Sequence, residues 1–194
     1  YTQGLLDLLD KYNVKVTFFV TNTHPDYQNL IAEEAKRGHT VAIHSASHKY
    51  NQIYTSEQAF FDDLEQMNSI IKAQTGNDAS IIRFPGGSSN TVSKDYCPGI
   101  MTQLVNDVTA RGLLYCDWNV SSGDANSKPI STEQVVQNVI SGVQSHNVSV
   151  VLQHDIKDFS VNAVEQIIQW GQANGYTFLP LTTSSPMSHH RVNN

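Results

Sequence analysis

Apolar and polar positions alternate along the chain in two patterns. Short runs of β-branched and aromatic residues, typical of strands, are separated by longer stretches in which apolar residues recur at helical spacing. The runs lie at residues 14–20, 40–43, 80–83, 113–115, 148–152 and 176–179, and the helical stretches at about residues 2–12, 25–37, 56–75, 99–111, 131–145 and 160–174. Gly or Asn before a run, as at Gly38 and Asn147, accepts the left-handed conformation that ends a helix.

This alternation predicts an α/β fold, with a parallel sheet and helices outside it. The sheet could be open and doubly wound or closed into a barrel, and we favour a barrel. In either form, functional residues belong at the carboxyl ends of the strands, where the loops converge. The chain begins with a helix, whereas an α/β barrel normally begins with a strand, so we expect a fragment that lacks its first strand. The alternative, a domain that truly starts with a helix, is disfavoured because it would leave a gap in the sheet with an exposed edge.

Length and composition narrow the class of protein. The 194 residues fit a single domain at residues 1–183, followed by a polar C-terminal tail at residues 184–194 that we expect to be loosely ordered. The net charge of -6 offers no basic surface for nucleic acid. We find neither an apolar run of membrane-spanning length nor a leader typical of a signal peptide, so no membrane contact is expected. Cys97 and Cys116 could form a disulfide or remain buried thiols.

Two histidines follow the run at residues 40–43. His44 and His48 are four residues apart, and on a helical turn such positions share one face. Neutral imidazole is a preferred ligand of Zn²⁺. The same spacing also occurs in solvated histidines and in histidines satisfied within a core. The spacing by itself therefore leaves a metal site and a structural pair open.

Other reactive side chains stand at further strand ends. Arg83 begins the segment 83–87, whose glycines can let backbone N–H groups approach a ligand, although an ordinary turn with an ion-paired arginine fits equally well. His154 follows the run 148–152 and could be a structural histidine. Asp124 could hold that imidazole protonated, or accept backbone N–H bonds as loop aspartates do. This many reactive side chains at the carboxyl ends of the strands is more than packing of the fold requires.

These segments together resemble a known family. The motifs that carry the resemblance are His44-Ser45-Ala46-Ser47-His48, Arg83-Phe84-Pro85-Gly86-Gly87, Trp118 to Asp124, and Leu152-Gln153-His154. In this order they resemble the polysaccharide deacetylases, the NodB-homology carbohydrate esterases, and in particular bacterial peptidoglycan N-acetylglucosamine deacetylases. The resemblance covers nearly the whole chain and implies a distorted barrel of parallel strands and helices.

The resemblance implies a metal-dependent hydrolase that removes N-acetyl groups from N-acetylglucosamine polymers outside the cell or in its envelope. Peptidoglycan is the expected substrate, with chitin oligomers or acetylated xylan as alternatives. His44 and His48 would bind a divalent metal, expected to be Zn²⁺, with Co²⁺, Ni²⁺ or Mn²⁺ as alternatives. The metal would activate a water, and the backbone N–H of Gly86 would stabilise the oxyanion.

The same resemblance gives roles to residues in the second half of the chain. His154 would protonate the departing amine as general acid, and Asp124 would tune it. Trp118 and Leu152 would line the pocket for the acetyl methyl group. Ala125 stands where the family often has a second tryptophan, which puts that wall of the groove in question.

One family motif is missing from these residues. Family members carry Thr-Phe-Asp-Asp-Gly on the first strand, where one aspartate is the catalytic base and the other a metal ligand. We therefore expect Arg83 to lack the base that it holds in the family, the metal to bind weakly or to be absent, and the chain to be inactive as given. Asp62 and Asp63 lie in a predicted helix, and we interpret them as a solvated face.

One alternative of a different class stays open. A non-catalytic carbohydrate-binding relative that kept its groove would show the same motifs. The five remaining histidines have no place in the implied chemistry, and we expect them at the surface or in the tail; they are His24, His39, His146, His189 and His190.

Overall fold

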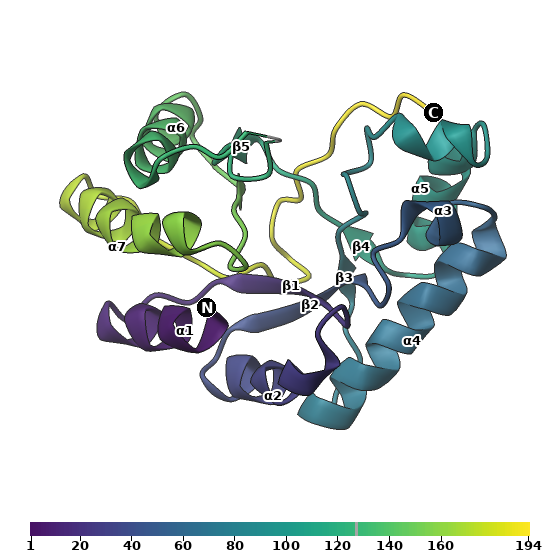
Figure 1. Cartoon of the computed structure of the whole chain (residues 1–194), viewed down its shortest axis with the longest axis horizontal. Helices are drawn as coiled ribbons and strands as arrows, with labels where there is room; N and C mark the ends of the chain where they lie inside the picture. The colour runs from purple at the N-terminus through teal and green to yellow at the C-terminus, as the bar shows by residue number, and fades with distance from the viewer. Residues whose placement is uncertain (127) are drawn as a thin grey trace. The chain divides into compact units, whose positions relative to one another are not determined.

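The computed structural model describes residues 1–126 and 128–194, and helices alternate with short parallel strands along it (Figure 1). The predicted α/β class is confirmed. The chain divides into two units, which we describe separately. The first unit comprises residues 1–15 and 118–179, and the second unit comprises residues 16–117 and 180–194.

In the described residues, the second unit contains a parallel sheet with the strands in the order β1-β2-β3-β4. The strands are β1 (Thr17–Thr21), β2 (Thr40–Ser45), β3 (Ile81–Ile82) and β4 (Leu114–Tyr115). Ile43 pairs with Ile82, and the Arg83 N–H continues the ladder by donating to the Ile43 carbonyl at 2.9 Å. Because the strands are parallel, His44 and Arg83 leave the sheet at the same edge.

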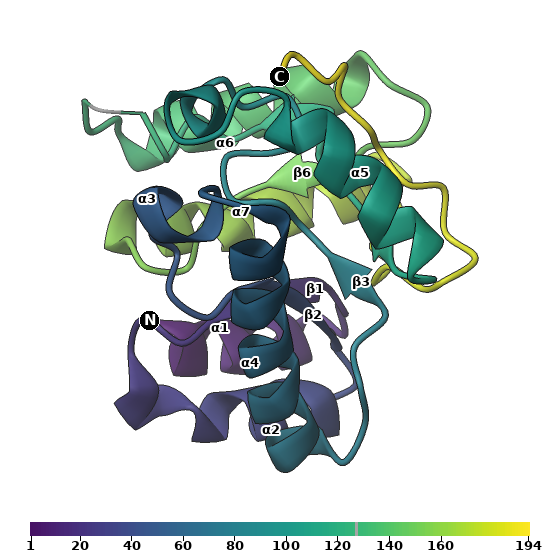
Figure 2. The same ribbon diagram turned by 90° about the vertical axis from the view of Figure 1, so that its right-hand side faces the viewer.

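The helices of the second unit are α2 (Asn29–Lys36), α3 (Tyr50–Ile53), α4 (Glu57–Thr75) and α5 (Ile100–Ala110), with the short 3-10 helices η1 (Pro25–Tyr27) and η2 (Val92–Asp95). The long helix α4 contacts α2 and packs on β2 (Figure 2). It begins at Ser56, whose Oγ accepts from the Ala59 N–H at 3.1 Å, and it ends at Gly76 in the left-handed conformation. Helix α3 was not predicted from the sequence.

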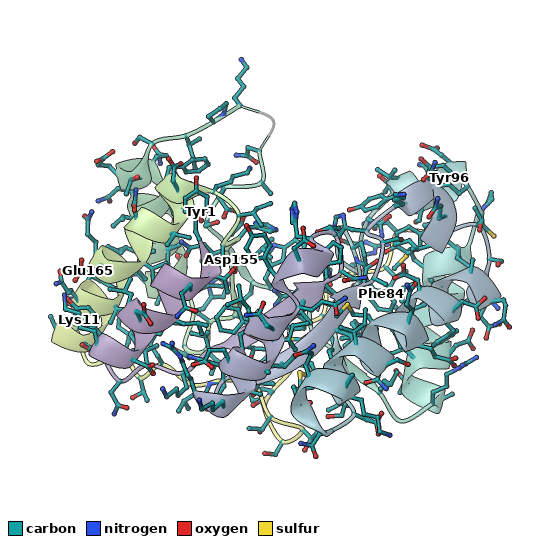
Figure 3. All side chains as sticks on the ribbon, turned by 60° about the horizontal axis from the view of Figure 1, so that its bottom comes forward. Tyr1, Lys11, Phe84, Tyr96, Asp155 and Glu165 are labelled. Atoms are coloured by element: carbon teal, nitrogen blue, oxygen red, sulfur yellow. The ribbon has the colours of Figure 1, made fainter. Side chains whose placement is uncertain are left out.

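The core of the second unit is aromatic as well as aliphatic. Phe84, labelled in Figure 3, is fully buried between Phe60 and Tyr115, with ring centroids 5.4 Å from each. The apolar side chains of α4 recur at helical spacing and supply much of this core. Cys97 and Cys116 are free thiols and not a disulfide, but only Cys116 is buried, as the second alternative expected; Cys97 is half-buried.

The C-terminal segment belongs to the second unit, and the expected loose order of residues 184–194 is wrong. The Asp117 N–H donates to the Ser188 carbonyl at 2.7 Å, and the His189 ring stacks on Tyr115 at a centroid distance of 4.0 Å. The segment ends beside α5 (Figure 1). Hydrogen bonds and ring stacking, which a polar composition does not reveal, hold it in place.

The first unit contains α1 (Thr2–Lys11), β5 (Val120–Ser121), α6 (Thr132–Gln144), β6 (Val151–Leu152) and α7 (Asp158–Ala173). Strands β5 and β6 pair in parallel, and α6 packs against α7 around a small apolar core. Helix α1 contacts α7 through Lys11 and Glu165, whose charged atoms are 2.7 Å apart (Figure 3).

Two further expectations are wrong. Residues 176–179 do not form a strand, because their β-branched and aromatic pattern finds no partner strand; Phe178 instead packs on Gly171 of α7. His39 is not at the surface but 6% exposed, with its ring edge-on to Phe18. Among the helices of the described residues, none has both the length and the apolar character needed to cross a membrane.

Candidate functional site

His44 and His48 converge, as predicted, at the edge of the sheet in the second unit. Their ring centroids are 5.0 Å apart, and the rings are tilted by 50°. The predicted helical turn is wrong, however. His44 is part of β2, and His48 lies in the following loop with φ +54°, a left-handed conformation that is uncommon outside glycine. A strand end and a sharp bend therefore bring the imidazoles together.

The hydrogen bond of the His44 ring determines its tautomer. Nδ1 lies 2.7 Å from the carbonyl oxygen of Arg83. Because a carbonyl can only accept, Nδ1 carries a proton, and in the neutral ring the lone pair is on Nε2. A ring N–H held by a backbone carbonyl is the usual arrangement in metal-ligating histidines, where it orients the ring.

Asp63 of α4 holds the loop between these histidines. Its Oδ2 accepts from the Ser45 hydroxyl at 2.6 Å and the Ala46 N–H at 2.9 Å, and its Oδ1 accepts from the Ser47 N–H at 2.8 Å. The interpretation of Asp63 as part of a solvated face is therefore wrong. Asp62 is exposed, as expected.

The amino-acid sequence contains a signal for the role of Asp63. The residue follows Phe60 by three positions and precedes Met67 by four, and both neighbours are buried. A carboxylate on the buried stripe of an amphipathic helix requires hydrogen-bond donors, because its burial without them is unfavourable. The identity of the donors could not be read from this pattern.

The Arg83 side chain follows β3 and is buried within the second unit. Its guanidinium donates to the carbonyl oxygens of Cys116 and Asp117, each at 2.9 Å, and lies 4.0 Å from the centre of the Phe19 ring. Burial lowers the pKa of Arg83 to about 10, so the group is still charged at neutral pH. Backbone carbonyls and a ring thus contribute to holding this cation.

Gly86 is the residue proposed from the resemblance to bind an oxyanion. It has φ +79°, and a Cβ added there would lie 2.6 Å from the Tyr50 hydroxyl oxygen. Conformation and space therefore both require glycine. Tyr50 also contacts the His48 ring at 5.7 Å between centroids, and one turn later the Tyr54 hydroxyl donates to the Pro85 carbonyl at 2.7 Å. Helix α3 thus connects the histidine loop to the glycine turn.

The first unit brings Asp124 and His154 together. One Asp124 oxygen lies 2.8 Å from Nδ1 of His154, and the other accepts from the His154 N–H at 2.7 Å and the Ser160 hydroxyl at 2.6 Å. Burial disfavours the charged carboxylate, but these hydrogen bonds outweigh burial and lower the pKa of Asp124 to about 2. The Lys157 ammonium donates to the Asp124 carbonyl. Asp124 is therefore an anion at neutral pH.

The predicted site residues are divided between the two units. The second unit holds His44, His48, Arg83 and Gly86, and the first unit holds Trp118, Asp124, Leu152 and His154. Trp118 and Leu152 are half-buried. Ser45, Asp63, Tyr50 and Ser160 were not predicted as part of either group, because their contacts join segments that are distant in sequence.

Comparison with known proteins identifies the family. Residues 1–97, half of the chain, match the family described as polysaccharide deacetylase. The chain belongs to the polysaccharide deacetylase family. The resemblance noted in the sequence is confirmed, and so is the α/β fold of this deacetylase family.

Individual relatives of this deacetylase chain differ in how closely they match. The catalytic domain of peptidoglycan N-acetylglucosamine deacetylase from Eubacterium rectale is 97% identical, with a TM-score of 0.99 over 100% of this chain and 88% of that one. A polysaccharide deacetylase from Bacillus cereus is 29% identical, with a TM-score of 0.82 over 100% of this chain and 90% of that one.

Curated relatives are longer than the chain. A peptidoglycan-N-acetylglucosamine deacetylase of Bacillus cereus is 29% identical over 92% of this chain, which spans 63% of that protein. A bifunctional xylanase/deacetylase of Pseudobutyrivibrio xylanivorans is also 29% identical, and the chain spans 28% of it. The chain therefore matches only part of each of these proteins.

Proposed function

We propose that this deacetylase is a metal-dependent hydrolase that removes N-acetyl groups from N-acetylglucosamine-containing polysaccharide, with peptidoglycan as its substrate. The observation that carries the proposal is the convergence of His44 and His48, with the His44 tautomer set by the Arg83 carbonyl. Acetamide hydrolysis at neutral pH needs an activated water and a stabilised oxyanion, and a metal at these imidazoles supports both.

The residues fit a divalent metal. Two imidazoles with centroids 5.0 Å apart, one of them with its lone pair on Nε2, are a donor set suited to Zn²⁺, and Co²⁺, Ni²⁺ and Mn²⁺ are the alternatives. His44 and His48 would hold the ion. When bound, it would polarise the acetyl carbonyl and lower the pKa of water.

Residues of the chain perform the remaining steps in this proposal. The Gly86 N–H donates to the negative charge that develops on the acetyl oxygen. His154 protonates the departing amine. Asp124, an anion at neutral pH, orients the His154 ring. Trp118 and Leu152 line the acetyl pocket. Arg83 would orient the catalytic base that family members carry in the Thr-Phe-Asp-Asp-Gly motif, which is missing from these residues.

The choice of peptidoglycan rests on the names of relatives. The Eubacterium rectale domain and the Bacillus cereus relative carry that substrate in their names. The bifunctional xylanase/deacetylase supports acetylated xylan as a second candidate, and chitin oligomers stay a third. Peptidoglycan places the protein at the cell envelope or outside the cell.

The test measures acetate release by the full-length protein from peptidoglycan, chitopentaose and acetylated xylan. We expect release from peptidoglycan that a chelator abolishes and Zn²⁺ restores, and its loss in His48→Ala and His154→Ala. Residues 1–194 assayed beside the full-length protein test the expected inactivity of the chain itself. Binding of these polymers without acetate release would favour the carbohydrate-binding alternative, and chelator-resistant release would overturn the metal proposal.

A further inference from the structure

We propose that Asp63 is a positioning residue for the metal site, holding the loop between His44 and His48 in its ligating shape. The inference rests on the proposed function of those histidines. Asp63 stands on α4, 15 residues after His48. The segment it binds, residues 45–47, lies entirely between the two imidazoles, so the carboxylate acts on the geometry that joins them.

Both carboxylate oxygens of Asp63 are engaged by this segment. Oδ2 accepts from the Ser45 hydroxyl and the Ala46 N–H, while Oδ1 accepts from the Ser47 N–H, at distances between 2.6 and 2.9 Å. Hydrogen bonds to an ionised acceptor are the strong ones. With both oxygens directed at the loop, the carboxylate is placed to shape the site and not to ligate the ion itself.

Ser45 extends this network to the second histidine. Its hydroxyl donates to Asp63 at 2.6 Å and accepts from the His48 N–H at 2.8 Å. The His48 backbone has φ +54°, a conformation that a residue with a side chain leaves readily unless its surroundings hold it. The chain of bonds from Asp63 through Ser45 to His48 supplies that restraint. Without it we expect the bend to relax and the imidazoles to separate.

The isosteric variant Asp63→Asn tests the carboxylate specifically. The Ala46 and Ser47 N–H groups point at different oxygens of Asp63. Whichever way an asparagine amide lies, its NH₂ faces one of these N–H donors, so one hydrogen bond is lost without a change in size. Asp62→Asn is the matched control, because it removes the same charge from the next residue of the same helix, on its exposed side.

The readouts are Zn²⁺ affinity by calorimetry and the visible absorption spectrum of bound Co²⁺, measured on the full-length protein. We expect Asp63→Asn to bind Zn²⁺ about 10- to 100-fold more weakly, the range typical for loss of a group that orients metal ligands, and to shift the Co²⁺ spectrum. Asp62→Asn should match the wild type in both. Thermal unfolding of the metal-free proteins separates a loss of fold from a loss of positioning.

Ser45→Ala and Asp63→Glu keep the proposal testable if Asp63→Asn does not fold. Ser45→Ala removes the relay to His48 and should weaken Zn²⁺ binding, whereas Asp63→Glu retains a carboxylate and should recover part of the affinity. Unchanged Zn²⁺ affinity and Co²⁺ spectrum in Asp63→Asn would overturn the inference. If the wild type binds no Zn²⁺, or if His48→Ala binds it equally well, the proposed function itself fails. That result is distinct from a failure of the inference about Asp63.

Discussion

Two carboxylates in this chain, Asp63 and Asp124, are held by hydrogen bonds from residues that are distant in sequence. Asp124 is 2% exposed and is nevertheless an anion, because His154 and Ser160 donate to it. Asp63 is fixed in the same manner by the loop that it holds. In both cases the donors lie on another segment, so the charge stabilises a tertiary contact and contributes to the free energy of folding.

The lowered pKa of Asp124 predicts a pH-dependent contribution to stability. Its folded pKa is about 2, against an ordinary value of 3.8. The contribution, about 2 kcal/mol, is complete above the ordinary pKa and is lost as the pH falls from about 4 through about 2. Asp124→Asn should therefore lower the free energy of unfolding at pH 7 and have a much smaller effect near pH 2.

Urea unfolding at a series of pH values measures this difference, and Asp62→Asn, at an exposed position, is the control. An Asp124→Asn deficit that is the same at both pH values would show that packing, and not ionisation, is responsible.

Helices and strands of the first unit are fitted together at glycines. Gly142 in α6 allows close approach of β5: a Cβ there would lie 2.5 Å from Cγ1 of Val120, which is itself 2% exposed. Gly171 of α7 similarly accommodates the Phe178 ring, with 2.6 Å from its potential Cβ to Cζ. These positions determine how near each helix comes to its neighbour.

Substitution at Gly142 should reverse the usual effect of glycine-to-alanine changes in helices. In an open helix, alanine stabilises by roughly 0.5–1 kcal/mol. At Gly142 the added methyl overlaps Val120, and overpacking of this kind destabilises by about 1–3 kcal/mol.

Gly4→Ala in α1 is the matched control, because nothing lies within 4 Å of its potential Cβ. Denaturant unfolding should give opposite signs for Gly142→Ala and Gly4→Ala. Stabilisation by both substitutions would mean that α6 can move away from β5 without penalty.

At the scale of the whole molecule, each unit is built from segments that are far apart in the chain. The second unit combines residues 16–117 with the C-terminal residues 180–194. Asp117, fully buried, accepts from the Ser88 hydroxyl at 2.5 Å and from the His190 N–H at 2.9 Å. The carboxylate thus joins the C-terminal segment to the end of β4.

Truncation after Thr183 should destabilise the second unit. It removes the His190 N–H from a buried carboxylate, the Ser188 carbonyl from the Asp117 N–H and the stacked ring from Tyr115. Loss of a partner from a buried charged group destabilises by about 1–3 kcal/mol, and these losses occur together. Thermal unfolding of full-length and truncated protein measures the effect, and an unchanged Tm would show that the segment is dispensable.

Much of the fold and part of the site could be predicted from sequence, because they depend on local patterns. Helical and strand periodicity located α1, α4, α6 and α7 and most strands, since the spacing of apolar side chains is set by backbone geometry. The strand-end positions of His44, Arg83 and His154 followed from the same reading, because parallel strands place their carboxyl ends at one edge.

Only the tertiary structure decided how these residues are held. Asp63 binds a loop 16 to 18 positions earlier, and Arg83 donates to carbonyls more than 30 positions later. Such contacts depend on how α4 packs on β2 and how the strands align, which no short stretch of sequence encodes. For the same reason residues 176–179 have a strand pattern but form no strand: pairing requires a neighbour, and only the packed chain determines whether one is present.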